Sequence, residues 1–153
     1  MIFHTTRFGD VDFPEDKCVH FSEGLLGFEK ETRFAFLPFT EEEDCPLQWM
    51  QSVYTAELAF VVTNPNHFLP DYSIKLENHE LFEIGLQPQD SFVLRVIVTI
   101  PDNYINMTAN LVGPLVFNSS RMTAKQFVLT ASKYDTKHYL FPEEIRKSTS
   151  KTS

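Results

Sequence analysis

The sequence predicts an all-β protein, an antiparallel β-barrel-like or sandwich domain with one short helix. Alternation of apolar and polar residues is the dominant periodicity, and nine short runs of this kind fill about 130 residues. Many short strands at this spacing are typical of sandwiches and barrels. Only one segment shows the spacing of an amphipathic helix, which completes the predicted fold class.

The strand expected at the centre of the sheet covers residues 91–100. β-branched residues crowd both of its faces, which is typical of a strand that is buried on both sides. One face carries Phe92, Leu94, Val96, Val98 and Ile100, and the other carries Ser91, Val93, Arg95, Ile97 and Thr99.

A hairpin partner for this strand is expected over residues 104–111, after a turn at 101–103. Its apolar face would carry Ile105, Met107, Ala109 and Leu111, and its wet face Tyr104, Asn106, Thr108 and Asn110. Further strands are expected over residues 2–8, 17–21, 33–37, 47–53, 58–63, 115–117 and 126–131.

One helix is expected over residues 78–84. Asn78 can cap it, Leu81, Phe82 and Ile84 would form its apolar side, and Gly85 would end it. The chain would then form a single domain over residues 1–142, followed by a flexible polar tail at 143–153. Residues 146–153 contain no apolar side chain that could offset the entropy of ordering them.

Composition places the chain among ordinary globular domains. Its 153 residues are 42% hydrophobic and 22% charged, with fifteen Phe and five Gly, which excludes disordered, collagen-like and coiled-coil classes. No apolar run is long enough to cross a membrane, so we expect a cytoplasmic protein with no membrane partner. The two cysteines, Cys18 and Cys45, are expected to be reduced, small core residues.

Charge is distributed unevenly along the chain. Residues 34–94 hold ten acidic side chains and one basic side chain, Lys75. This segment alone therefore carries a charge of −9, and the rest of the chain brings the net charge to −8. A surface that binds phosphates needs clustered Lys or Arg, so we expect no direct contact with nucleic acid. The run of acids at 41–44 is either a solvated loop or an acidic face that steers a basic protein partner.

The sequence contains no motif that indicates catalysis, a metal or a cofactor. No two of the five histidines have the spacing that places both at one metal, and no nucleophile elbow, phosphate loop or Cys-x-x-Cys motif is present. An enzyme is therefore not supported. Paired carboxylates such as Glu77 and Glu80 in a cleft are the one enzymatic alternative left open.

Two loops stand out as structural or functional features. Residues 22–28 hold two glycines three positions apart, where the backbone is expected to need a positive φ or a close approach. Residues 64–72 follow a strongly apolar strand and hold two prolines, two asparagines and two aromatic residues. This second segment is either a stiff loop or a surface that presents Asn64, Phe68 and Tyr72 to a partner.

Four segments in order form a recognisable pattern: Phe-Ser-Glu-Gly-Leu-Leu-Gly-Phe-Glu at 21–29, Leu-Gln-Trp-Met-Gln-Ser at 47–52, Phe-Val-Val-Thr-Asn-Pro at 60–65 with Pro-Asp-Tyr at 70–72, and Asn-Leu-Val-Gly-Pro-Leu-Val-Phe-Asn at 110–118 followed by Gln126. Their order and spacing resemble the FliW family of flagellar assembly factors, over about residues 2–141. Two residues depart from the family pattern: Leu26 stands where proline is usual, and Gly113 where alanine is frequent.

The resemblance implies a monomeric, antiparallel barrel-like protein of the bacterial cytoplasm without enzymatic activity or cofactor. It also implies two protein partners. Members of the family bind the translational repressor CsrA, relieve its repression of the flagellin message, and are themselves titrated by flagellin. A dedicated flagellin chaperone that has lost CsrA binding is the alternative.

The residues expected to contact a partner lie in two segments. Asn64 and Pro65 end an apolar strand, and Asp71, Tyr72 and Glu77 would lie near one face if the loop folds back. The polar turn from Asn110 to Pro114 is the other candidate. We expect no catalytic residue and no metal ligand.

Overall fold

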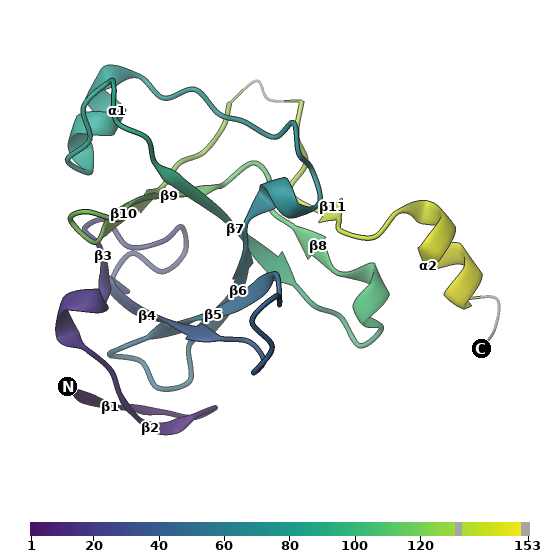
Figure 1. Ribbon diagram of the computed structural model, residues 1–153, viewed down its shortest axis with the longest axis horizontal. Coiled ribbons are helices and arrows are strands. Elements are labelled where there is room, and N and C mark those ends of the chain that lie inside the picture. Colours follow the sequence, from purple (N-terminus) through teal and green to yellow (C-terminus); the bar gives the residue numbers. More distant parts are fainter. Residues whose placement is uncertain (131–132, 151–153) are drawn as a thin grey trace.

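Seven strands of the protein close into a barrel, shown in the computed structural model in Figure 1. The structure describes residues 1–130 and 133–150. The strands are β1 (Ile2–Thr5), β2 (Gly9–Asp12), β3 (Val19–Phe21), β4 (Arg33–Pro38), β5 (Leu47–Ser52), β6 (Ala59–Thr63), β7 (Val93–Thr99), β8 (Thr108–Ala109), β9 (Leu115–Asn118), β10 (Thr123–Gln126) and β11 (His138–Tyr139).

Closure of the barrel depends on β7. The main sheet runs β11-β8-β7-β6-β5-β4-β3-β10-β9, and β7 pairs with β9 as well as with β6 and β8. The predicted all-β barrel-like class is confirmed, and so is the central place of this strand. One neighbour pair departs from the antiparallel expectation, because β3 and β10 run parallel.

The barrel interior is filled by a core of mostly aromatic and aliphatic side chains, as in other small barrels. Its buried members are Val19, Phe21, Leu25, Phe34, Met50, Val62, Leu115, Phe117 and Ala124. Ile97 of β7 packs against this interior core, whereas its neighbours Val96 and Val98 belong to a second core outside the barrel. Both faces of β7 are therefore covered, which explains why apolar residues occur on both.

The second core lies between β7 and the segments that cross its outer face. Tyr72, Met107, Ala109 and Leu111 are buried there with the outward side chains of β7. Residues 104–111 were predicted as one strand, but Tyr104–Asn106 form a 3-10 helix and only Thr108–Ala109 pair with β7. Burial still alternates as the sequence predicts, because this segment needs an apolar side to cover β7 whatever its backbone form.

Other strand boundaries also differ from the sequence prediction. The strand expected at 126–131 is β10, which lies earlier, and residue 131 lies outside the described part of the chain. Strands β2 and β11 were not predicted. Both carry little apolar alternation and are defined by pairing with β1 and β8.

The described residues form two α-helices, where the sequence predicts one helix. Helix α1 (Asn78–Glu83) is capped by Glu77, one residue before the predicted cap, and the Glu77 N–H donates to Glu80 Oε1 at 2.8 Å. Helix α2 (Glu143–Ser150) replaces most of the predicted tail and extends away from the barrel in Figure 1. An ion pair of 2.7 Å between Lys147 and Glu143 stabilises it. Residues 151–153 lie outside the described residues.

Candidate functional site

The loop after β6 is rigid because Asn66 organises it. Asn64 Oδ1 accepts the Asn66 N–H at 3.0 Å and so caps the 3-10 turn Pro65–His67. The Asn66 side-chain amide donates to the carbonyls of Leu69, Pro70 and Tyr72. Of the predicted contact residues here, Pro65 is fully buried and Asn64 is half-buried.

Tyr72 is a core residue and is not the presented aromatic that the sequence predicts. Its side chain is 3% exposed, and its hydroxyl donates to the Leu111 carbonyl at 2.8 Å. Burial raises the pKa of the phenol above its ordinary value, and the neighbouring Tyr134 adds to this effect. Asp71 and Glu77, in contrast, are exposed, so they can meet a partner directly.

The turn from Asn110 to Pro114 is a rigid polar corner. Asn110 Oδ1 accepts the N–H groups of Val112 and Gly113, both at 3.1 Å, and Pro114 is fully buried. Asn110 is therefore committed to the turn itself. The sequence-predicted contact residues come from two separate segments, which meet where the Tyr72 hydroxyl donates to the Leu111 carbonyl of the turn.

The glycine-bearing loop at 22–29 covers one end of the barrel, which we call the closed end, because Leu25 is buried there in the interior core. A surface pocket of about 280 Å³ lies beside the loop, lined by Leu26, Phe28 and Gln126 among others. Phe28 N–H donates to the Leu25 carbonyl at 2.7 Å across a turn with Gly27 at φ +83°. Gly24 has φ +66°, and a Cβ there would lie 2.4 Å from the Glu29 oxygen. The predicted need for positive φ or close approach is confirmed at Gly24.

Gln126 joins this loop to the polar turn. Its Oε1 accepts the Leu26 N–H at 2.9 Å, and its Nε2 donates to the Gly113 carbonyl at 3.0 Å. A proline at 26 would have no N–H to give, and a Cβ at 113 would lie 2.9 Å from Gln126 Nε2. Both departures from the family pattern therefore meet at one side chain.

A groove of about 760 Å³ runs beside β4 and β5. Its apolar lining includes Phe8, Val11, Phe36, Phe39 and Leu47, and its rim carries the acidic loop residues Glu41, Glu42 and Glu43, which are exposed. Cys45 also lines the groove and is half-buried, so it is not the core residue that the sequence predicts. Cys18 is buried as predicted.

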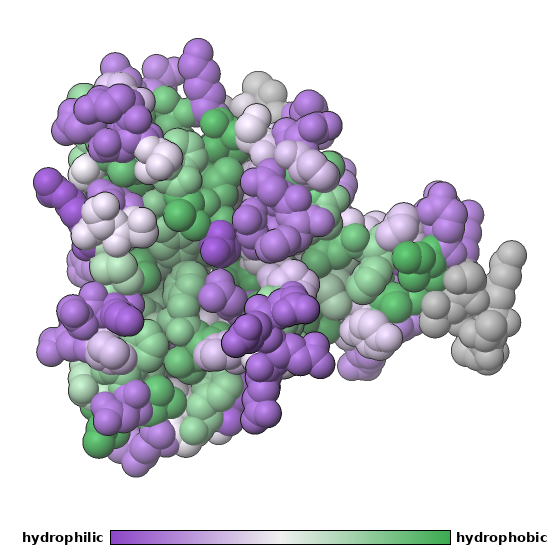
Figure 2. Space-filling view, viewed as in Figure 1, coloured by the Kyte–Doolittle hydropathy of each residue, from purple (hydrophilic) through white to green (hydrophobic). Residues whose placement is uncertain are grey.

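The groove continues into the second, open end of the barrel. A pocket of about 280 Å³ lies there, and it shares Phe36 and Gln48 with the groove. The rest of its lining is Lys17, Val19, Val93, Arg95, Phe117, Asn118, Ser119, Met122 and Thr123. Figure 2 shows hydrophobic surface over the barrel in the view of Figure 1, bordered by hydrophilic groups. We call this pocket the barrel mouth.

Arg95 is a functional candidate that is not among the residues predicted from the sequence. It lies on the same face of β7 as Ile97, which packs in the barrel interior, and burial lowers the pKa of its guanidinium. The signal was present in the sequence, since a charged residue interrupts an otherwise apolar central strand. Predicting its place requires the closure of the barrel, which puts the β7 end beside Gln48 of β5.

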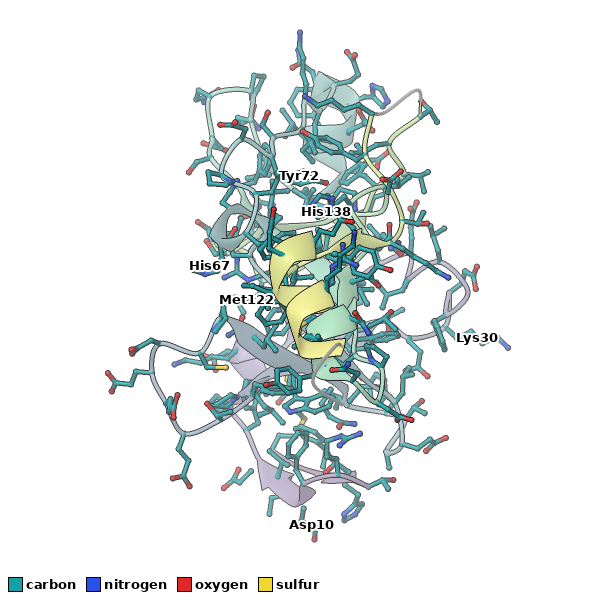
Figure 3. The ribbon with its side chains drawn as sticks, turned by 90° about the vertical axis from the view of Figure 1, so that its right-hand side faces the viewer. Asp10, Lys30, His67, Tyr72, Met122 and His138 are labelled. Carbon is teal, nitrogen blue, oxygen red and sulfur yellow. The ribbon has the colours of Figure 1, made fainter. Side chains whose placement is uncertain are left out.

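The structure offers no assembled metal centre among residues 1–130 and 133–150. No group of three His, Cys, Asp or Glu side chains there could hold a metal ion. In Figure 3 the labelled Asp10 lies far from His67 and His138. Glu80 accepts from the backbone of Glu77, so its carboxylate serves the helix cap. No helix in the described part is long and apolar enough to span a membrane.

Comparison with known proteins gives consistent matches. The chain matches the model of the FliW protein family over residues 2–140. It is 41% identical over 142 residues to the flagellar assembly factor FliW of Geobacter sulfurreducens, covering 93% of this chain and 87% of that protein. It is 36% identical over 147 residues to the flagellar assembly factor FliW of Alkaliphilus metalliredigens, covering 96% of this chain and 90% of that protein. A crystal structure of the flagellar assembly factor FliW superposes with a TM-score of 0.83 at 35% identity, covering 94% of this chain and 99% of that one.

Proposed function

Because this chain belongs to the FliW family of flagellar assembly factors, we propose that it binds CsrA and antagonises CsrA repression of flagellin mRNA translation. In this proposal flagellin also binds the protein and titrates it away from CsrA. The protein would act in the cytoplasm as a monomer and would need no cofactor. Family membership supports a regulatory or chaperone type of activity in flagellum assembly rather than an enzymatic one.

One observation carries the choice of a basic partner. Glu41, Glu42 and Glu43 are exposed at the rim of a groove whose floor is apolar. A repressor that binds RNA needs a basic surface, and opposite charges on two proteins accelerate their encounter. The apolar floor would then supply the contact area that keeps the complex together.

The first test is whether the protein competes with RNA for binding to CsrA. Adding the purified protein to a complex of CsrA and its RNA should release the RNA or prevent its binding in a gel-shift assay. The protein alone should not retard RNA at moderate salt, because residues 34–94 carry a charge of −9. Retardation of RNA by the protein alone would contradict the proposal.

The second test locates the contact. Changing Asp71 and Glu77 together to Lys should weaken CsrA binding more than tenfold, about 1.4 kcal/mol, mainly through the association rate and less so at high salt. Both side chains are exposed, but Glu77 also caps α1, so Asp71→Lys alone tests the surface without touching the cap, and circular dichroism checks the fold of the double variant. Changing Glu57 and Asp102 to Lys is the matched control, because both are exposed and the charge change is the same on other parts of the surface.

Asn64 tests the same surface by a different route. Asn64→Lys should weaken CsrA binding by a similar factor, mainly through faster dissociation, because it crowds the contact. It also removes the oxygen that caps the turn at Pro65, so Asn64→Asp, which keeps that oxygen, is its control. Wild-type affinity in both Lys variants would confine the interface to the groove and its rim or move it to the turn from Asn110 to Pro114.

The chaperone alternative is favoured by one feature of the closed end of the barrel. Leu26 and Phe28 are 58% and 41% exposed there, and an apolar patch of this kind suits an aggregation-prone flagellin segment. Binding of flagellin that is insensitive to salt, together with no affinity for CsrA, would support the chaperone. Affinity for CsrA that falls steeply with salt would support the regulator.

A further inference from the structure

The barrel mouth contains an arginine whose charge is not balanced by a neighbouring acid. No carboxylate of the described residues lies within ion-pair distance of Arg95. Its Nη1 donates to the carbonyl of Leu94 in its own strand at 2.7 Å, and its Nε is 3.5 Å from Gln48 Oε1. A guanidinium has five N–H donors, so most of its hydrogen-bonding capacity is unused by these partners.

This arrangement is unfavourable for folding. Moving a charge out of water without an opposite charge costs free energy, and burial already lowers the pKa of this group. An apolar residue at position 95 would match Val93 and Ile97 on the same face and would not carry that cost. Polar groups that weaken a fold in this way are characteristic of binding sites.

The shape of the barrel mouth limits what can occupy it. At about 280 Å³ it lies at the lower end of ligand pockets and has room for one or two residues of a chain. Val19, Phe36, Phe117 and Met122 give it apolar walls, and packed side chains of the barrel core close its inner end. The groove of about 760 Å³ opens into it past Phe36 and Gln48, so an extended chain can reach it.

We propose that the barrel mouth binds a carboxylate carried on an apolar segment of a partner protein, with Arg95 as its ion-pair partner. Arg95 pairs with the carboxylate in the fork geometry that guanidinium and carboxylate share. The apolar walls take the side chains next to the carboxylate, and Lys17 adds positive charge at the rim. This site goes beyond the proposed regulatory function and does not depend on whether CsrA, flagellin or another protein supplies the segment.

A matched pair of peptides tests the site directly. N-acetyl-Leu-Leu with a free carboxylate and its C-terminal amide differ only in charge, and acetate is a third probe. In nuclear magnetic resonance titrations of the whole labelled protein, the acid should cause saturable shifts at Arg95 Nε–H and at the amides of Val19 and Thr123. The amide and acetate should each bind at least tenfold more weakly.

Two variants separate binding from folding. Arg95→Met should weaken binding of the acid at least tenfold and leave the melting temperature unchanged or higher, because it removes an unpaired charge. Arg95→Lys should keep part of the affinity, because it retains the charge but loses the fork. Equal binding of acid and amide, shifts that map elsewhere, or no saturable shift would overturn the proposal. Equal binding of acetate would show a free-anion site, and a lower melting temperature of Arg95→Met would show a structural arginine. Either result would also overturn it.

Discussion

The two ends of the barrel use their polar side chains in opposite ways. At the closed end, both functional atoms of the Gln126 amide are bonded, one to the Leu26 N–H and one to the Gly113 carbonyl. At the open end, Arg95 has one short bond, to the carbonyl of its own neighbour, and one long contact. At the closed end the polar side chain joins separate loops, whereas at the open end Arg95 has hydrogen-bond donors that these two partners do not use.

This difference distinguishes a structural polar residue from one that is available for binding. A side chain whose donors and acceptors are all used contributes to stability when it is present and leaves unpaired groups when it is removed. A desolvated charge with few partners contributes little to folding and can bind a ligand. Substitutions matched between the two ends can test this comparison.

Introducing a carboxylate should have the largest effect. Leu111→Asp should unfold the domain, because Leu111 is fully buried in the turn from Asn110 to Pro114. An unpaired buried carboxylate costs several kcal/mol against a total stability of roughly 5–15 kcal/mol. Val93→Asp should change the free energy of unfolding by less than about 1 kcal/mol, because Val93 is 37% exposed and lies with Arg95 in the barrel mouth. Circular dichroism and urea unfolding measure both, and similar losses would contradict the comparison.

Tyr72 holds the same turn from the other side, and its removal should rank second. Tyr72→Phe leaves the buried Leu111 carbonyl without its donor, so it should lower the free energy of unfolding by about 1–3 kcal/mol at pH 7. A Tyr54→Phe variant is the control, because Tyr54 is 67% exposed and should lose little.

The same tyrosine should make the fold sensitive to alkali. Burial raises its pKa in the folded state, so its contribution is present below the unfolded value of about 10 and is lost as the pH rises above it. Burial also raises the pKa of Cys18, which adds a loss that starts above about pH 8.5. Above pH 10, the free energy of unfolding should fall less steeply with pH in Tyr72→Phe than in the parent, as measured by urea unfolding at a series of pH values. An unchanged slope there would contradict this assignment.

A pair of glutamines gives the sharpest comparison of the two ends. Gln126→Leu should lower the free energy of unfolding by about 1 kcal/mol, because it removes two hydrogen bonds that join separate loops. Gln48→Leu at the open end should stay within about 0.5 kcal/mol of the parent, because the side chain of Gln48 has one hydrogen bond to the described residues, the 3.5 Å contact to Arg95. Equal losses in urea unfolding would show that the open end is also built for stability.

The smallest effect is expected at Gly113. Gly113→Ala should cost less than about 1 kcal/mol, because the new methyl group displaces the end of the Gln126 side chain but no backbone. In the Gln126→Ala background the same change should cost less, since the nearest crowded group is gone and Asn110 Nδ2, at 3.2 Å, is the next atom. A double-mutant cycle measures this coupling, and additive effects would show that Gly113 and Gln126 act independently.

Much of the fold could be predicted from the sequence because burial follows local pattern. The run at 91–100 indicates a central strand, and residues 104–111 alternate in burial as expected even where they form a 3-10 helix. Strands β2 and β11 and helix α2 escaped prediction because partners elsewhere define them. For α2, the Arg146 guanidinium lies over the Tyr139 ring at 3.6 Å, a contact that no local pattern shows.

The candidate site was less predictable. Exposure of Asp71 and Glu77 follows from their charge, but Tyr72 and Pro65 are buried, and only the packing of the loop against β7 and the polar turn decides this. An aromatic residue in a polar loop can equally be a contact or an anchor. Its hydroxyl distinguishes the two, and here it is bonded inside the protein.

By itself, the sequence determined the fold class, the acidic character of residues 34–94 and the glycine conformations of the loop at 22–29, since each depends on residue type and near neighbours. The tertiary structure alone decided that β7 meets β9, so that Arg95 and Gln48 face one another at an open barrel end. It also decided that Leu26 and Gly113 meet at Gln126, a hundred positions from Leu26. Pairing between distant strands places these side chains together, and that pairing is set by the free energy of the whole core rather than by any local segment.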